Sequence, residues 1–446
     1  MRKNKKGTTT LFLAIVLSAL ILVETTYMAY VADLDRRLTY SRALKEQTEI
    51  YLASYDRTLF KAYGIYAFNS NEIDSELFES ILAANGYESG DVMYVSGLYS
   101  FDTDDLERAV AVFYSYRATG IAVNRLSDQI NALIEGLDAT GAYSSLRQFT
   151  SSPASGVIGR ILDGGSQIVE AVSFAVNTLG FDESSSELSF FWDLMNGLGA
   201  LNNDHPDVGE GFDPTDMGFV LNLIEFQSGL YDIGTSFNEG IGQHVCLMDY
   251  AANNFDCFLP DDTTLNGTEF SCFHGDNIPD AEYILTGVEG IGGCALTDLY
   301  IYGFCFVKNL VSNLTDPETM ELIQSAGEIL SAVVTALSLG SVPLPPEVYT
   351  AVIAAIWSEL QSTGDLSTIL AGDEITIIEV EEAQILTMGY RDFLTLYMVF
   401  VPDSQLLTRM VEIINRDFPD YVTGIETETS YYGSVISYEA VYELYG

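Results

Sequence analysis

The N-terminus carries a basic start followed by a long apolar run, and this pair constrains the chain more than any other feature. Residues 2–6 read RKNKK, and Leu11–Val23 is almost entirely aliphatic. Together with the flanking threonines and 25–32, the run reaches the roughly 20 residues that a helix needs to cross a bilayer. The basic residues predict that the short side stays in the cytoplasm. We therefore predict a cytoplasmic stub at 1–9 and a transmembrane helix at 10–32.

A cleaved signal peptide has the same basic start and apolar core, so it is the competing interpretation. Cleavage favours small residues at alternating positions, and Ala29-Tyr30-Val31-Ala32 matches that pattern poorly. No cysteine directly follows the run, which argues against a lipid anchor. The sequence thus favours a single-pass cell-membrane protein with an extracellular ectodomain.

Glu24 is unusual because a carboxylate within a span is costly, and less so near an interface. It lies either at the outer headgroup level or against another subunit inside the membrane.

Beyond the span, a stalk helix is predicted over 33–68, because this segment contains no proline and hardly any glycine. Apolar residues recur there at spacings of three and four and share one face. Such a stripe packs on the protein's own domain or on another subunit. With Glu24, the candidate interface residues are Leu44, Tyr51, Tyr55, Leu59 and Tyr63.

Charge excludes one class of partner. The chain holds 19 Lys and Arg against 64 Asp and Glu, for a net charge of −45. So negative a chain repels phosphate backbones, which excludes nucleic acid as a partner. The acidity fits a solvated surface, salt adaptation or a cation-binding role, and these stay open. At 48% hydrophobic residues the chain still has enough apolar mass for a core.

The ectodomain is predicted to be α+β and predominantly α-helical. A long N-terminal transmembrane and stalk helix would pack on a helical ectodomain with a small β-rich insertion. Helical patterns recur at about 104–137, 298–314, 317–339, 346–362, 389–400 and 404–416. Residues 375–380 (ITIIEV) and the tail from Tyr421 are predicted as strands. The predicted parts are a helical part at 69–240, a cysteine-containing β-rich insertion at 241–288, and a helical part with terminal strands at 289–446.

The β-rich prediction at 241–288 follows from four turn signals between short apolar pieces, such as Asn266-Gly267. All five cysteines lie near this region, and extracellular cysteines can form stable disulfides. The disulfide candidates are Cys246, Cys257, Cys272 and Cys294. Cys305 is predicted to be a buried apolar residue, because eleven residues of helix would keep it too far from Cys294 to bond.

Motifs that carry chemistry are scarce. Three histidines occur in the chain, and two have nearby cysteines, at His244-Val245-Cys246 and Cys272-Phe273-His274. Phosphate-binding loops, nucleophile elbows and zinc-protease motifs are absent from the sequence. We therefore predict no enzyme activity and no cofactor. A calcium site is the one exception considered, and its weak candidates are Asp204, Asp207, Asp213, Asp216, Asp276, Asp280 and Glu282.

Four segments carry a resemblance to a known family. They are Gly7 through Glu24, Tyr55–Phe68 (YDRTLFKAYGIYAF), Glu282–Gly287 (EYILTG), and Met388–Leu396 (MGYRDFLTL) with Leu406–Met410 (LLTRM). In this order they resemble a poorly characterised, mainly clostridial family of single-span proteins. Its members are often associated with tight-adherence (Tad) pilus loci, alongside TadE- and TadG-like pseudopilins.

The resemblance implies a minor pilin-like or pilus-assembly component, whose partners are pilus or secretion proteins or like subunits. One position departs from the pseudopilin pattern. Counting five residues from Gly7 gives Phe12, where processed pseudopilins carry glutamate. An anchored accessory role therefore fits better than polymerisation into a pilus shaft.

Two other functions were weighed against the anchored structural or assembly component. A cation- or ligand-binding receptor or adhesin would need a concave polar pocket in the ectodomain. An exported hydrolase would need a clustered nucleophile and base, which the sequence motifs do not supply.

Overall fold

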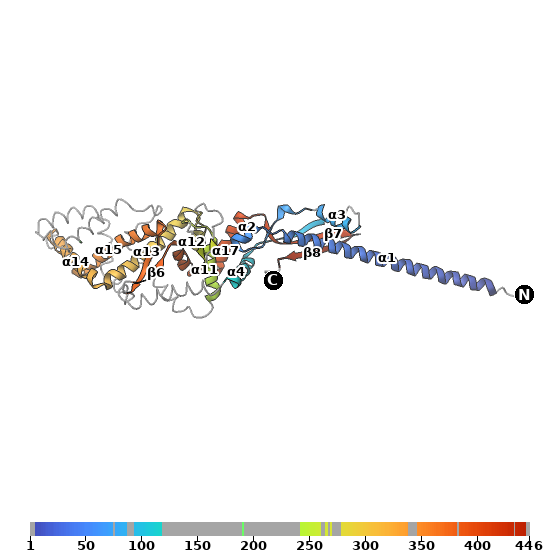
Figure 1. Ribbon diagram of the computed structural model, residues 1–446, viewed down its shortest axis with the longest axis horizontal. Helices are drawn as coiled ribbons and strands as arrows, with labels where there is room; N and C mark the ends of the chain where they lie inside the picture. Colours follow the sequence, from blue (N-terminus) through green and yellow to red (C-terminus); the bar gives the residue numbers. More distant parts are fainter. Residues whose placement is uncertain are drawn as a thin grey trace. The chain divides into compact units, whose positions relative to one another are not determined.

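The computed structural model is mostly helical with a few antiparallel strands, which confirms the predicted α-rich class. It divides into two compact units (Figure 1). Unit 1 comprises 1–112 and 411–446, and unit 2 comprises 113–410. The structure describes residues 5–74, 76–86, 93–117, 190, 241–259, 264–265, 268–269, 278–337, 346–380, 383–431 and 433–442.

Unit 1 is built on one long helix, α1 (Lys5–Ala53), which has 49 residues. A four-stranded antiparallel sheet packs on the second half of this helix (Figure 1). The central strand β7 pairs with all three others. The strands are β1 (Phe68–Asn69), β2 (Met93–Ser100), β7 (Tyr421–Tyr431) and β8 (Ser434–Val441).

The helix predicted over 33–68 is wrong in its second part, because α1 ends at Ala53. A short second helix, α2 (Arg57–Tyr63), follows after a turn. The carboxylate of Asp56 accepts hydrogen bonds from the first backbone amides of α2, which makes it the N-cap. Gly64 ends α2 in the left-handed region at φ 68°, a conformation that glycine adopts without strain. Local capping therefore overrides the helical pattern.

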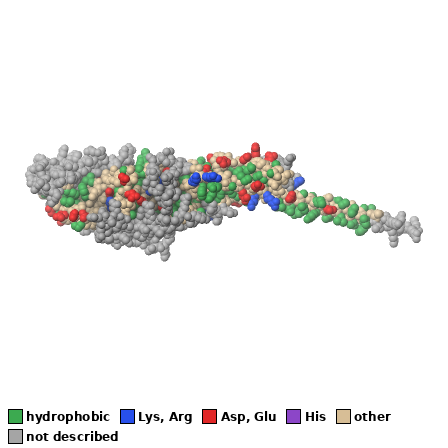
Figure 2. All heavy atoms as spheres, in the orientation of Figure 1, with side chains coloured by type: hydrophobic (Ala, Val, Ile, Leu, Met, Phe, Trp, Pro, Cys, Tyr) green, Lys and Arg blue, Asp and Glu red, His purple; other side chains and the backbone are tan. Residues whose placement is uncertain are grey.

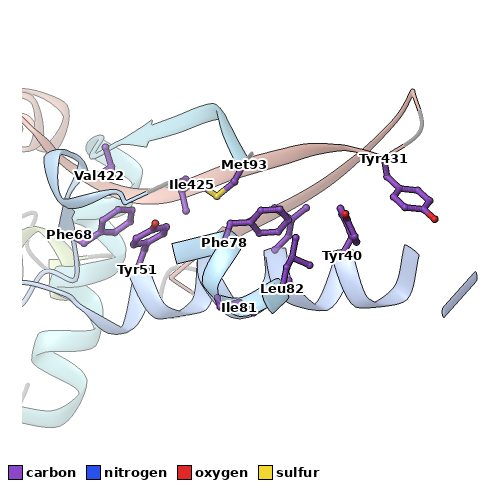
Figure 3. Packing of buried hydrophobic residues seen from close by; sticks show 12 residues of the cluster. Tyr40, Tyr51, Phe68, Phe78, Ile81, Leu82, Met93, Val422, Ile425 and Tyr431 are labelled. Carbon is purple, nitrogen blue, oxygen red and sulfur yellow. The ribbon is translucent and has the colours of Figure 1, made fainter. Parts of the chain in front are cut away.

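The buried face of α1 forms the centre of the unit 1 core (Figure 3). Tyr40 packs on Tyr431 with ring centroids 5.1 Å apart, and Tyr51 stacks on Phe68. Helix α3 (Glu76–Ala84) adds further apolar side chains to the same core. The core residues are Tyr40, Ala43, Leu44, Tyr51, Phe68, Phe78, Ile81, Leu82, Met93, Val422, Ile425 and Tyr431.

Hydrogen bonds fix the C-terminal hairpin to α1 along its length. The hydroxyl of Tyr431 donates to Asp33 at 3.1 Å, and that of Tyr442 donates to the carbonyl of Leu52 at 2.7 Å. Between these two, the hydroxyls of Thr48 and Thr427 lie 2.9 Å apart and both side chains are buried. The two ends of the described chain are thereby joined in one unit.

Unit 2 is predominantly helical. Its longest helix, α13, is mostly buried and packs against α14 and α15, and one β-hairpin follows α15. The helices are α11 (Ile241–Asn254), α12 (Asp280–Thr286), α13 (Ile291–Thr315), α14 (Pro317–Leu337), α15 (Pro346–Leu370) and α16 (Tyr390–Met398). The strands are β3 (Thr264–Leu265), β4 (Thr268–Glu269), β5 (Ile375–Val380) and β6 (Ala383–Met388). Two helices contain a boundary between the units: α4 (Thr103–Arg117) and α17 (Asp403–Asp417).

The β-rich insertion predicted at 241–288 is corrected in its first part, since 241–254 is helical. The turn signals all lie after Asn254, so nothing in the earlier segment interrupts a helix. The last part of the insertion is corrected as well, since α12 is helical. Between the two helices, β3 and β4 form a short antiparallel pair, Thr264 opposite Glu269. The predicted terminal strands exist, but they belong to unit 1 with the stalk rather than to a part spanning 289–446.

The packing of α1 on the sheet predicts that alanine substitutions at two apolar positions of this helix change the stability of unit 1 by very different amounts. Leu44 is fully buried, whereas Ile50 is 43% exposed. Leu44→Ala should lower the free energy of unfolding of unit 1 by about 2–5 kcal/mol, through lost burial and a cavity. Ile50→Ala should change it by less than about 0.5 kcal/mol. Hydrogen exchange of peptides from α1 in the full-length protein measures both, and equal effects would contradict the packing.

Candidate functional site

The first half of α1 is a helix whose apolar side chains nothing in unit 1 covers (Figure 2). Its most apolar 18-residue window has a mean hydropathy of 2.1 and is 0% buried. The large side chains there are between 42% and 68% exposed. They are Leu11, Phe12, Leu13, Ile15, Val16, Leu17, Leu20, Ile21, Leu22, Val23, Tyr27, Met28, Tyr30 and Val31. So large a continuous apolar surface needs a cover other than water.

A second described helix, α13, is also long and apolar enough to span a bilayer. Its mean hydropathy is lower, 1.2, and 67% of that window is buried inside the protein. Fifteen of its residues belong to the buried interior of unit 2. We conclude that α13 is a core helix, and that α1 is the possible membrane anchor.

Polar groups in the apolar half of α1 fall into two classes. The hydroxyls of Thr25 and Thr26 donate to backbone carbonyls one turn back, at 2.8 and 2.7 Å, so the helix itself satisfies them. The carboxylate of Glu24 is exposed and joins no other group in the described part of the chain. Glu24 is therefore the charged group that a bilayer would leave unsatisfied in this stretch.

The structure corrects most of the predicted interface residues. Leu44, Tyr51, Leu59 and Tyr63 are at most 5% exposed, and all belong to the core of unit 1. Tyr55 is half-buried within an aromatic group with Phe60 and Tyr66. The stripe at three- and four-residue spacing is thus the face that packs on the protein's own sheet. Of the six candidates, Glu24 alone remains exposed.

Two exposed apolar residues of α1 escaped the sequence-based prediction. Leu34 and Leu38 are 45% and 48% exposed and lie among charged residues beyond the predicted span. They form an i, i+4 pair on a face other than the buried one, and this spacing was the signal that could have identified them.

Unit 2 holds a buried acidic group around Glu282 of α12, whose side chain is 0% exposed. One carboxylate oxygen accepts hydrogen bonds from the Phe258 amide and from the Tyr390 hydroxyl, both at 2.9 Å. The other oxygen, like Oδ1 of Asp298 on α13, is buried without a hydrogen-bonding partner in the described residues.

Burial is the main cause of the raised pKa values in this acidic group. Burial, and then the charge of Glu282, raise the pKa of Asp298 to about 7. Burial also raises the pKa of Glu282, against hydrogen bonds and the nearby Arg391 charge that lower it. The pKa of the Cys294 thiol rises to about 12 for the same reason, burial first and then Glu282. A thiol this basic is not a nucleophile at neutral pH.

Arg409 of α17 completes the surroundings of α12. Its guanidinium Nη1 donates to the carbonyls of Ile284 and Leu285, at 2.7 and 3.0 Å, and so caps the end of the helix. At Gly287 the backbone has φ 73°, and a Cβ would lie 2.7 Å from Arg409 Nη2. The last two of the four segments that carry the resemblance thus meet at α12, through Glu282, Tyr390 and Arg409.

The predicted calcium ligands divide between described and undescribed residues. Asp280 and Glu282 are buried on α12, and within the described ranges no group of three His, Cys, Asp or Glu side chains could hold a metal ion. The other candidates lie outside the described residues: Asp204, Asp207, Asp213, Asp216 and Asp276.

Disulfides were predicted among four cysteines, and the structure corrects this for three of them. Cys246, Cys257 and Cys294 are buried, and no disulfide joins the cysteines that the structure describes. They fill apolar positions instead, because 241–254 is a helix and Cys294 lies in the core helix α13. Cys305 is buried, as predicted. Cys272 lies outside the described residues.

The His244–Cys246 neighbours do not form a catalytic pair. His244 lies on α11 and pairs through Nδ1 with Asp403, while its Nε2 lies 3.2 Å from the carbonyl of Val399. Burial and the charge of Asp249 raise the pKa of Cys246. The histidine therefore joins α11 to the segment that leads into α17.

The chain matches no family model, no curated protein and no solved structure.

The buried carboxyl of Asp298 predicts a pH-dependent stability for unit 2. Its pKa is raised above the ordinary value of 3.8, so the folded state retains a proton that the unfolded state has lost. This stabilisation is complete below about pH 4 and is lost as the pH rises through about 7. Asp298→Asn, which stays neutral, should therefore stabilise unit 2 at pH 8 by about 1–3 kcal/mol and have little effect at pH 4.

Urea titrations of the full-length protein at the two pH values measure this difference. Asp373→Asn is the matched control, because Asp373 is exposed, and it should change stability at neither pH. An identical response of the two variants would show that Asp298 is not a buried acid.

Proposed function

We propose that this chain is a single-span membrane protein whose ectodomain acts through protein–protein contacts as a structural or assembly component of the cell surface. The short basic N-terminus stays in the cytoplasm, the apolar half of α1 crosses the bilayer, and the rest of unit 1 lies outside together with unit 2. The observation that carries this proposal is the 0% buried apolar window of α1, which has a mean hydropathy of 2.1.

The continuity of α1 supports an anchor that is retained rather than cleaved. The same helix runs from the apolar window into the core of unit 1, where Leu44 is fully buried. Unit 1 contacts α1 from Asp33 onward, through the hydroxyl of Tyr431. Cleavage near Ala32 would interrupt this continuous helix.

The acidity of the chain supports protein partners. A net charge of −45 disfavours nucleic acid and anionic lipid headgroups, and it favours proteins that present basic surfaces. The alternative of a cation- or ligand-binding receptor has less support, because Asp280 and Glu282 are buried in the packing around α12.

The appendage that we propose is a Tad-type pilus, and this part of the proposal rests on the sequence resemblance. We propose an anchored accessory role with pilus or secretion proteins as partners.

Fractionation of native membranes tests the anchor. The full-length protein should resist carbonate extraction, and its intact mass should correspond to a chain that keeps the apolar segment. Protease added outside the cell should degrade both units. A soluble species that begins near Asp33 would contradict the anchored topology.

Crosslinking and affinity recovery from the same membranes tests the assembly role. Recovery of pilus-secretion components together with the full-length chain is the expected result. A protein that resists extraction but yields no protein partner would contradict the assembly role and leave the anchor intact.

A further inference from the structure

The exposed half of α1 contains an apolar stripe with the period of a coiled coil. Residues spaced alternately by three and four recur from near the start of the apolar segment into the stalk, which is the a and d pattern of a heptad repeat. We call this stripe the α1 seam. It consists of Leu13, Leu17, Leu20, Glu24, Tyr27, Val31, Leu34 and Leu38, all exposed.

The seam lies away from the face on which unit 1 packs. At about 100° per residue, its centre is about 140° around the helix from the face that carries Tyr40, Leu44 and Tyr51. A second helix could therefore lie along the seam without displacing the sheet. After Leu38 the pattern ends, because the next positions are Ser41 and Lys45.

Lipid cannot cover the outer end of the seam. The span of about 20 residues that begins at Thr10 ends before Asp33, and the next residues include Asp35 and two arginines. Leu34 and Leu38 follow this boundary and remain 45% and 48% exposed. Outside the bilayer, such a pair is stabilised by packing against another protein surface.

Glu24 gives the seam a polar position inside the membrane. A carboxyl group facing hydrocarbon alone is costly, and its cost falls when it pairs within a helix bundle. In two parallel copies the two Glu24 side chains lie at the same depth, where they can share a proton and a hydrogen bond. One polar residue in an apolar heptad seam also fixes the register and number of the helices.

We propose that the α1 seam is a parallel self-association surface, occupied by the α1 seam of a second copy of this chain. A second copy fits because every copy enters the membrane in the same direction, so Glu24, Leu34 and Leu38 meet their equivalents at the same depth. This inference rests on the proposed function, because it requires α1 to span the membrane.

Disulfide crosslinking in intact membranes tests the seam. In a full-length chain with Cys272→Ser, single substitutions Leu34→Cys and Leu38→Cys should give dimers on mild oxidation. Ala32→Cys is the matched control, since Ala32 is exposed but lies about 120° from the seam. It should give little dimer, and the described native cysteines are buried.

The contribution of Glu24 is measured in the Leu34→Cys background. Glu24→Ala should lower the dimer association constant about three- to tenfold, from the loss of an interhelical hydrogen bond. Glu24→Gln keeps a hydrogen-bonding side chain and should retain most of the dimer. The dimer fraction is followed over a range of protein-to-lipid ratios.

Three outcomes would contradict self-association through the α1 seam: equal crosslinking at all three positions, no crosslinking at any, or crosslinking of Leu34→Cys to a different protein. Carbonate extraction of the same samples shows whether only the self-association or also the membrane anchor is contradicted. A monomer retained in the membrane contradicts only the seam, whereas release from the membrane contradicts the proposed function as well.

Discussion

The packing of α1 against the C-terminal hairpin is the interaction on which unit 1 depends. The buried hydroxyls of Thr48 and Thr427 meet across 379 residues of sequence, and Tyr431 and Tyr442 bind the helix at either end of its docked half. Contacts this distant in sequence cost much loop entropy before they form. Unit 1 therefore folds only when its C-terminal part, 411–446, is present. In the sequence, unit 2 lies between the two parts of unit 1.

The two halves of α1 consequently have different surroundings, although they form one continuous helix. Its first half exposes apolar side chains on every side, and its second half buries one face in the core. No glycine- or proline-rich linker separates the two halves, so the apolar segment and the face that packs on the sheet of unit 1 belong to the same helix. The exposed leucines beyond the span follow from this arrangement, because docking covers only one face.

Unit 2 shows how so acidic a chain can bury some of its acids. The hydrogen bonds of Tyr390 and the Phe258 amide reach one oxygen of Glu282, and Arg391 lies near enough to lower its pKa. Asp298 is buried beside Glu282 instead, and both burial and that charge raise its pKa. Arg409 caps α12 beside them, so this basic side chain contributes to the packing of unit 2.

Local pattern in the sequence was sufficient for the apolar anchor helix, for the long helices after 298 and for the strands at 375–380 and from Tyr421, since periodicity and hydropathy act over neighbouring residues. It also located the stripe through Leu44 and Tyr51. The residues that cover this stripe come from a strand almost 400 residues away, and no local sequence pattern specifies that contact. For the same reason tertiary packing decided that the exposed side of α1 is the opposite one, and that the four described cysteines are buried with no disulfide between them.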